Sequence, residues 1–341
     1  MKRLLLTLLS LCLTHTVTAQ QQAEIVSVNK IWDKAPHNGF TDLVRFKNLF
    51  FCCFREADSA FGSNGRVRIL ISSTGGNWVD YAEIAEKGTD LRDPKLEVTP
   101  DGKRLYLLCT GVAYEGTAVK SRRPRYSTTT DGKVWTPPQK LLAEGDSLWR
   151  CVVNPADQKL YGVSFNMFPT TGGPRPEAEW SLKSYTSGDG SVWQLSSLMQ
   201  VPGQPNETTL RFLKDGSALA LVRREAADKL GYIGSASTPY REWKWSPLPI
   251  VVQGQNFIQL PDGSLIAGSR GRGTTPGAHM VLFTMTPTSL TPLIELPSGG
   301  DCSYPGLLWH DKHLWVSYYS SHEGKAAIYL ARLRLPWVKA E

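Results

Sequence analysis

The stretch LEVTPDGKRLYLL, residues 96–108, decides the fold class. Two apolar strand-like runs flank Asp101-Gly102, and both turn residues tolerate a positive φ, so the stretch predicts a tight β-hairpin. Two close copies follow, RFLKDGSALALV at 211–222 and IQLPDGSLI at 258–266. Weaker copies are centred on three further dipeptides: Lys47-Asn48, Asp157-Gln158 and Asp311-Lys312.

These six turns recur at a nearly constant interval. They stand at positions 47, 101, 157, 215, 262 and 311, which are 47 to 58 residues apart. Repeats of this length are typical of four-stranded propeller blades. Their radial arrangement leaves only short, protected sheet edges. We therefore expect an all-β chain folded as a six-bladed β-propeller.

A second marker keeps step with the hairpins. A hydroxyl residue, an Asp or Thr, a Gly and a Trp share one spacing in SSTGGNW (72–78), TTDGKVW (129–135) and SGDGSVW (187–193), and Ser237 and Trp243 keep the spacing alone. Such residues form a self-bonded turn on which the Trp packs. The marker resembles the Asp-boxes (BNR repeats) of the sialidase superfamily, one residue shorter than usual, and Asp-boxes identify the fold rather than the activity.

The N-terminus has the pattern of a secretory signal peptide. Lys2 and Arg3 precede an apolar run of about ten residues, which is too short to span a bilayer. Val17-x-Ala19 fits the small-residue cleavage rule. We expect residues 1–19 to be removed, leaving one domain at 20–341 that is secreted or periplasmic. The alternative is a buried N-terminal strand.

Composition excludes several classes of protein. The net charge of +7 is modest and lies in no long block, so we expect no nucleic-acid partner. No second apolar run is long enough for a membrane span, no cofactor motif is present, and we expect a monomer. The cysteines follow no metal or disulfide spacing, and we interpret five of them as buried apolar thiols: Cys52, Cys53, Cys109, Cys151 and Cys302.

The hairpin turns also act as a ruler for the inner strands. Residues about eight steps before and after a turn lie at the same end of the two strands. Arginine is almost never buried without a partner, so a recurrence of arginine at this level predicts a charged pocket at one end of the ring. The charged and tyrosine residues at that level are Arg55, Arg223, Arg270, Asp93, Glu207 and Tyr304.

Over nearly its whole mature length the chain resembles the sialidase superfamily. The resemblance rests on Glu207, which precedes Arg223 by 16 residues, on SRGR at 269–272 and on GDCSYPG at 300–306. It implies a retaining exo-glycoside hydrolase in which Tyr304 is the nucleophile and Glu207 its base. It also implies that Arg223 and Arg270 bind the carboxylate of a terminal acidic sugar, because arginine forms paired hydrogen bonds with carboxylates.

The chain departs from the sialidase pattern at the first arginine. Sialidases carry Phe-Arg-Ile-Pro there, whereas Thr41 stands in place of the arginine. Arg55, one strand later, either compensates for this loss or serves another purpose. We also include Arg92 and Arg272 among the expected substrate-binding residues. The departure suggests a reshaped carboxylate subsite.

Three functions remain open from the sequence. The first is hydrolysis of a glycoside of sialic or uronic acid, with Asp58 as general acid or Asp93 as the fallback. The second is a non-catalytic glycan-binding propeller. The third is a polysaccharide lyase, in which Tyr304 is the base and arginine neutralises the substrate carboxylate.

Overall fold

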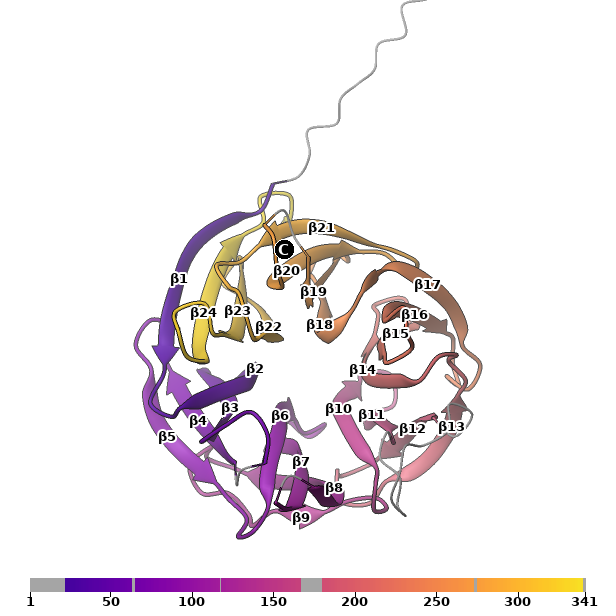
Figure 1. The fold of residues 1–341 in the computed structure, drawn as a ribbon. Coiled ribbons are helices and arrows are strands. Elements are labelled where there is room, and N and C mark those ends of the chain that lie inside the picture. The colour runs from indigo at the N-terminus through magenta and orange to yellow at the C-terminus, as the bar shows by residue number, and fades with distance from the viewer. Residues whose placement is uncertain (1–21, 63–64, 117, 167–179, 273–274, 340–341) are drawn as a thin grey trace, which may run out of the picture.

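The computed structural model describes residues 22–62, 65–116, 118–166, 180–272 and 275–339. The predicted signal peptide therefore lies outside the described residues. Six four-stranded antiparallel sheets stand around a central axis (Figure 1). The expected six-bladed β-propeller is thus confirmed. No described segment forms a helix that is long and apolar enough to cross a membrane.

The blades follow one another along the chain, and each of the first five uses four consecutive strands. Blades 1 to 3 consist of β2 (His37–Phe46), β3 (Leu49–Ala57), β4 (Arg66–Ser72) and β5 (Val79–Ile84); β6 (Asp90–Val98), β7 (Leu105–Glu115), β8 (Ala118–Thr129) and β9 (Gln139–Lys140); and β10 (Ser147–Asn154), β11 (Lys159–Phe165), β12 (Leu182–Ser187) and β13 (Gln194–Met199). Blades 4 and 5 consist of β14 (Pro205–Phe212), β15 (Ala218–Arg224), β16 (Leu230–Ala236) and β17 (Lys244–Val251); and β18 (Gln253–Gln259), β19 (Leu265–Gly271), β20 (His279–Met285) and β21 (Leu290–Glu295).

Blade 6 joins the two ends of the described chain. Its inner strands come from the C-terminal end, whereas its outermost strand, β1, comes from the N-terminal end and pairs with β24. Figure 1 shows β1 running along the outside of this blade. The four strands are β22 (Cys302–His310), β23 (His313–Ser320), β24 (Ala327–Arg334) and β1 (Glu24–Trp32).

All six predicted hairpin turns join the first and second strands of a blade. Lys47 and Asn48 both have a positive φ, of 47° and 64°, as do Asp311 and Lys312. Two consecutive positive φ angles are what a two-residue hairpin turn of type I′ requires. Two of the three weaker copies therefore have the turn geometry that Asn-Gly or Asp-Gly usually provides, whereas at Asp157-Gln158 only Gln158 has a positive φ.

The second marker forms the turns between the third and fourth strands. In the second blade, Gly132 N–H donates to Thr129 Oγ1 across 2.9 Å, and Trp135 Nε1 donates to Gly132 O across 2.9 Å. Gly132 has φ of 80°, and a Cβ there would lie 2.3 Å from the Phe51 ring. The turn therefore packs directly against the neighbouring blade, which explains the glycine.

The blades pack against one another through apolar side chains. The clusters between them are dominated by aromatic and aliphatic residues from the strand interiors. The five cysteines named above are free and buried among the described residues, as predicted. The core thus holds the six sheets at fixed angles around the axis, and the inner strands position the candidate site.

Candidate active site

The first strand of every blade carries the same irregularity. The register with the second strand skips two residues, which is a β-bulge, and bulges re-aim side chains next to active sites. Four of the bulges begin with a residue of positive φ: Phe40, Asp93, Gly254 and Tyr304, with φ between 52° and 64°. The six bulges are Phe40-Thr41, Asp93-Pro94, Trp149-Arg150, Asn206-Glu207, Gly254-Gln255 and Tyr304-Pro305.

Tyr304, Glu207 and Arg223 form a hydrogen-bonded group. The Tyr304 hydroxyl donates to Glu207 Oε1 across 2.7 Å, and Arg223 Nη1 lies 3.1 Å from the same oxygen and 3.4 Å from the hydroxyl. Gly254 N–H donates to Glu207 Oε2 across 3.1 Å. A Cβ at position 254 would lie 2.9 Å from the Tyr304 ring, so glycine permits the close approach. A hydroxyl bonded to an anchored carboxylate is the arrangement of an activated nucleophile.

The environment of Tyr304 keeps its hydroxyl protonated. Burial, followed by the negative charge of Glu207, raises its pKa well above the usual value, while Arg223 lowers it in part. The Phe40 and Trp149 rings lie 5.0 and 5.6 Å from the Tyr304 ring and account for much of this burial. Tyr304 therefore needs a base that removes its proton during attack, and Glu207 is in contact for that role.

Asp93 is a second carboxylate whose charge acts on Tyr304. It is 8% exposed, and its charge is among the causes that raise the pKa of Tyr304, after burial and Glu207. Within the described chain its carboxylate accepts no hydrogen bond, so it is open to a substrate oxygen. Lys95 Nζ donates to the carbonyls of Asp93 and Pro94, across 3.3 and 3.1 Å, and thereby holds the bulge.

A second polar group surrounds Arg270. Its Nη2 donates to Asp301 Oδ1 across 2.9 Å, and its Nε donates to the Cys302 carbonyl across 2.6 Å. The Tyr319 hydroxyl donates to the same Asp301 oxygen across 2.7 Å, and His37 Nε2 lies 3.5 Å from the other one. Burial alone would raise the pKa of Asp301, but His37, Tyr319 and Arg270 outweigh it and lower the pKa. Asp301 is therefore an ionised carboxylate in contact with Tyr319.

Several solved structures are similar to this chain in fold. A protein of unknown function from Dyadobacter fermentans aligns with a TM-score of 0.75 and 16% identity, over 93% of this chain and 99% of its own. Penicillium chrysogenum α-L-arabinanase complexed with arabinobiose gives 0.71 and 14%, over 92% and 99%. Trypanosoma rangeli sialidase in complex with the inhibitor DANA gives 0.66 and 12%, over 91% of this chain and 58% of its own.

The chain has the sialidase-type propeller fold. No protein-family model matches the sequence, and no curated protein is similar to it in sequence. The chain spans just over half the length of the sialidase chain that it resembles. At identities of 11–16% these likenesses establish the fold alone, so the activity has to be argued from the site.

The propeller brings most of the predicted site residues together. Tyr304, Glu207 and Arg223 are in contact, and the charges of Asp93 and Arg270 both act on the tyrosines of the site. Arg92 lies behind Asp93, where its Nη1 donates to Ala60 O and Asp90 Oδ2. It is 5% exposed, with its guanidinium 5.1 Å from the Phe40 ring. Arg92 is therefore buried against Asp90 and Phe40 and does not face a ligand.

Three predicted residues are not brought into this group. Arg55 is 0% exposed because its Nε and Nη2 donate to both oxygens of Asp90, across 2.7 and 2.9 Å. It stabilises the contact between blades 1 and 2 and replaces no substrate-binding arginine. Asp58 is exposed on the segment after β3, and Arg272 is exposed after β19. In the described chain no contact links either of them to Tyr304.

Several residues of the site escaped the sequence analysis. Lys95 lies 4.8 Å from the Trp149 ring, and alternation from Asp93 indicated that it shares the inner face. Burial lowers the pKa of Arg122, and the charges of Asp93 and Glu207 raise it in part. In the sequence, Arg122 stands in the basic run Lys120-Ser121-Arg122-Arg123, which is typical of a solvated surface. Thr41, at the position of the missing arginine, is buried and donates to the Tyr304 carbonyl across 2.8 Å.

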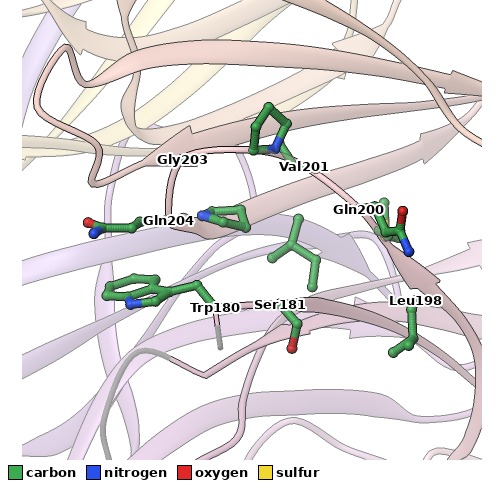
Figure 2. Close-up of a pocket in the computed structure, with 11 residues that line it drawn as sticks. Trp180, Ser181, Leu198, Gln200, Val201, Gly203 and Gln204 are labelled. Carbon is green, nitrogen blue, oxygen red and sulfur yellow. The ribbon is translucent and has the colours of Figure 1, made fainter. Parts of the chain in front are cut away.

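Two surface hollows lie outside the groups formed around Tyr304 and Tyr319. One, of about 1000 Å³, borders them through Gln253 and Arg270 and extends over blades 4 and 5 to Arg272. The other, of about 610 Å³, lies between blades 3 and 4, and Trp180, Leu198 and Gln204 are among the residues that line it (Figure 2). Of these two hollows, only the first borders the site, through Arg270.

Glu97 lies on the same strand as Asp93, where the charges of Arg211, Arg150 and Asp42 act on it, and a pH-dependent cost to stability is expected there. Burial raises the pKa of Glu97 from 4.5 to about 7, against the lowering effect of Arg211. A carboxyl group whose pKa is higher in the folded than in the unfolded state does not destabilise the fold at a pH below its unfolded-state pKa. As the pH rises from there to the folded-state pKa, it lowers the free energy of unfolding progressively.

Glu97→Gln is therefore expected to leave the free energy of unfolding unchanged at pH 4.5 and to increase it at pH 8 by on the order of 2 kcal/mol. Urea unfolding at the two pH values measures the difference. Glu242→Gln, at an exposed position, is the matched control. An equal effect of Glu97→Gln at both pH values would contradict the burial of this carboxylate.

Proposed function

We propose that this chain is a retaining glycoside hydrolase that releases a terminal sugar, with Tyr304 as nucleophile and Glu207 as its base. The observation that carries the proposal is the 2.7 Å hydrogen bond from the Tyr304 hydroxyl to Glu207, with Arg223 in contact with both groups. The sialidase and arabinanase among the structural neighbours support a glycosidase on this fold.

The proposed reaction has two displacements at one carbon. Tyr304 Oη attacks the anomeric carbon as its bond to the leaving oxygen breaks. Glu207 takes the phenolic proton, and Asp93 gives a proton to the leaving oxygen. Water then attacks the same carbon, Asp93 takes a proton from the water, and Glu207 returns its proton to Tyr304 as the bond to the sugar breaks. Two displacements leave the anomeric configuration retained.

Two sugar classes are compatible with this chemistry. The sequence resemblance favours a carboxylated sugar, because the charges of Arg223 and Arg270 both act on Tyr304. The arabinobiose complex of the neighbouring arabinanase favours a neutral sugar. The site's own hydrogen bonds distinguish the two classes, as argued in the next subsection.

The test is hydrolysis of a panel of aryl glycosides, neutral and carboxylated, by the full chain. NMR of the first-formed product is expected to show retention. A 2-fluoro analogue of the glycoside that is turned over is expected to label the peptide that contains Tyr304, as read by mass spectrometry. Inversion of configuration, or a label elsewhere, would refute the tyrosine nucleophile.

The same panel separates the alternatives. Binding without turnover on every member would favour a glycan-binding propeller. An unsaturated uronide product would identify a lyase that uses Tyr304 as base. Each of these outcomes would overturn the hydrolase proposal.

A further inference from the structure

The two arginines expected to hold a substrate carboxylate already bind carboxylates of the chain. Arg223 Nη1 lies 3.1 Å from Glu207 Oε1, and its Nη2 lies 2.6 Å from Glu225 Oε1. The side chain of Arg223 is 19% exposed. Each terminal nitrogen of this guanidinium therefore already contacts a carboxylate of the chain, so the positive charge of Arg223 is offset by Glu207 and Glu225 before any ligand binds.

Arg270 is likewise paired with a carboxylate of the chain, that of Asp301. The Asp301 side chain is 42% exposed, so it faces the solvent-accessible side of the group rather than the core. Arg270, Tyr319 and His37 surround its two oxygens, which fixes the carboxylate in place. Asp301 thus offsets the positive charge of Arg270 before any ligand binds.

The third arginine of the sialidase pattern has no replacement at its own position. The Thr41 hydroxyl is taken by the Tyr304 carbonyl and Ser317, at 2.8 and 2.9 Å. The adjacent Phe40 presents an apolar ring to Tyr304 and Tyr319, with ring centroids 5.0 and 5.4 Å away. Thr41 and Phe40 themselves therefore offer a ligand carboxylate no positive charge, and Arg55 is sealed in its pair with Asp90.

We propose that the sugar bound at this site is neutral, and that Asp301 and Arg270 together bind adjacent hydroxyl groups of it. An ionised carboxylate accepts hydrogen bonds from two hydroxyls, and a guanidinium donates to their oxygens. A carboxylated sugar would instead meet Glu207 and Asp301, and juxtaposed like charges are strongly unfavourable. This inference rests on the proposed function and names its substrate class.

Asp301→Asn is the variant that tests the inference. The wild-type chain is expected to prefer neutral over carboxylated glycosides by at least about 100-fold in kcat/KM. Because the amide removes the negative charge and frees Arg270, the variant is expected to lose about 10–100-fold on the neutral glycoside and to improve on the carboxylated one. Asp228→Asn, which removes an arginine–aspartate pair on the exposed side of blade 4, is the matched control.

A binding measurement separates this inference from the proposed reaction. Calorimetric titration of the Tyr304→Phe chain with free neutral sugars and with the matching uronic acids needs no turnover. Binding of neutral sugars only, weakened by adding Asp301→Asn, supports the inference even where no glycoside is hydrolysed, and in that case only the hydrolase proposal fails. Preferred binding of uronic acids, equal binding of both classes, or no binding of either would overturn the inference.

Discussion

Tyr304→Phe is expected to abolish turnover of the best glycoside while leaving the fold intact. The substitution removes the atom that would bond to the sugar, and the loss is expected to exceed the roughly 10²–10⁴-fold contribution of a proton-transfer group. The ring contacts with Phe40 and Trp149 remain, so the protein still folds. Steady-state kinetics on purified protein, with a thermal melt of the same sample, measures both effects.

Glu207→Gln and Tyr318→Phe give this prediction its controls. Glu207→Gln keeps the shape of the hydrogen-bonded group but accepts no proton, so kcat is expected to fall roughly 10²–10⁴-fold. Tyr318 is also buried, but its hydroxyl donates to the Pro297 carbonyl away from Glu207, and its variant is expected to keep full turnover. Undiminished turnover in Tyr304→Phe would exclude a tyrosine nucleophile.

Asp90→Ala is expected to destabilise the propeller by about 3–5 kcal/mol, the usual cost of removing one partner from a buried ion pair. Asp90 and Arg55 are both 0% exposed, and Asp90 also accepts hydrogen bonds from Arg92 and from Gly65 N–H. Without Asp90, the Arg55 charge is left in the contact between two blades. Urea unfolding of the variant measures the change.

The double variant Arg55→Met/Asp90→Leu shows whether the charge or the volume is responsible. Replacement of a buried ion pair by apolar residues is often neutral, so the double variant is expected to recover most of the stability lost in Asp90→Ala. Glu323→Ala breaks the exposed pair with Lys30 and is expected to have little effect. A loss in Asp90→Ala no larger than in Glu323→Ala would show that burial of the pair is unimportant.

The hairpin turns could be predicted because their chemistry is local. Asp101-Gly102 and its relatives specify a turn by their own φ preferences, and six repetitions at one interval leave few folds other than a propeller. The ruler taken from these turns also located the level of Asp93, Glu207 and Tyr304. The fold, and the end of the ring at which these three residues lie, therefore follow from short-range rules applied to a repeat.

The pairing of the charges could not be predicted in the same way. Arg55 and Arg270 have the same offset from their turns, yet one is sealed against Asp90 from the next blade and the other binds Asp301. These partners are brought close only by packing between blades. The bulge that turns Tyr304 toward Glu207 has one mark in the sequence, Pro305, since proline inside a strand is typical of edges and bulges, but the sequence does not show which side chain the bulge redirects.

The pairing of β1 with β24 has a consequence for how the chain folds. Each of the first five blades can form from one contiguous segment as it is made, but the sixth needs Glu24–Trp32 beside Ala327–Arg334. This contact spans almost the entire chain, so its loop-closure entropy is paid last. Until then, the ring has unpaired strand edges that are open to other chains. The interval before closure is therefore when aggregation competes most strongly with folding.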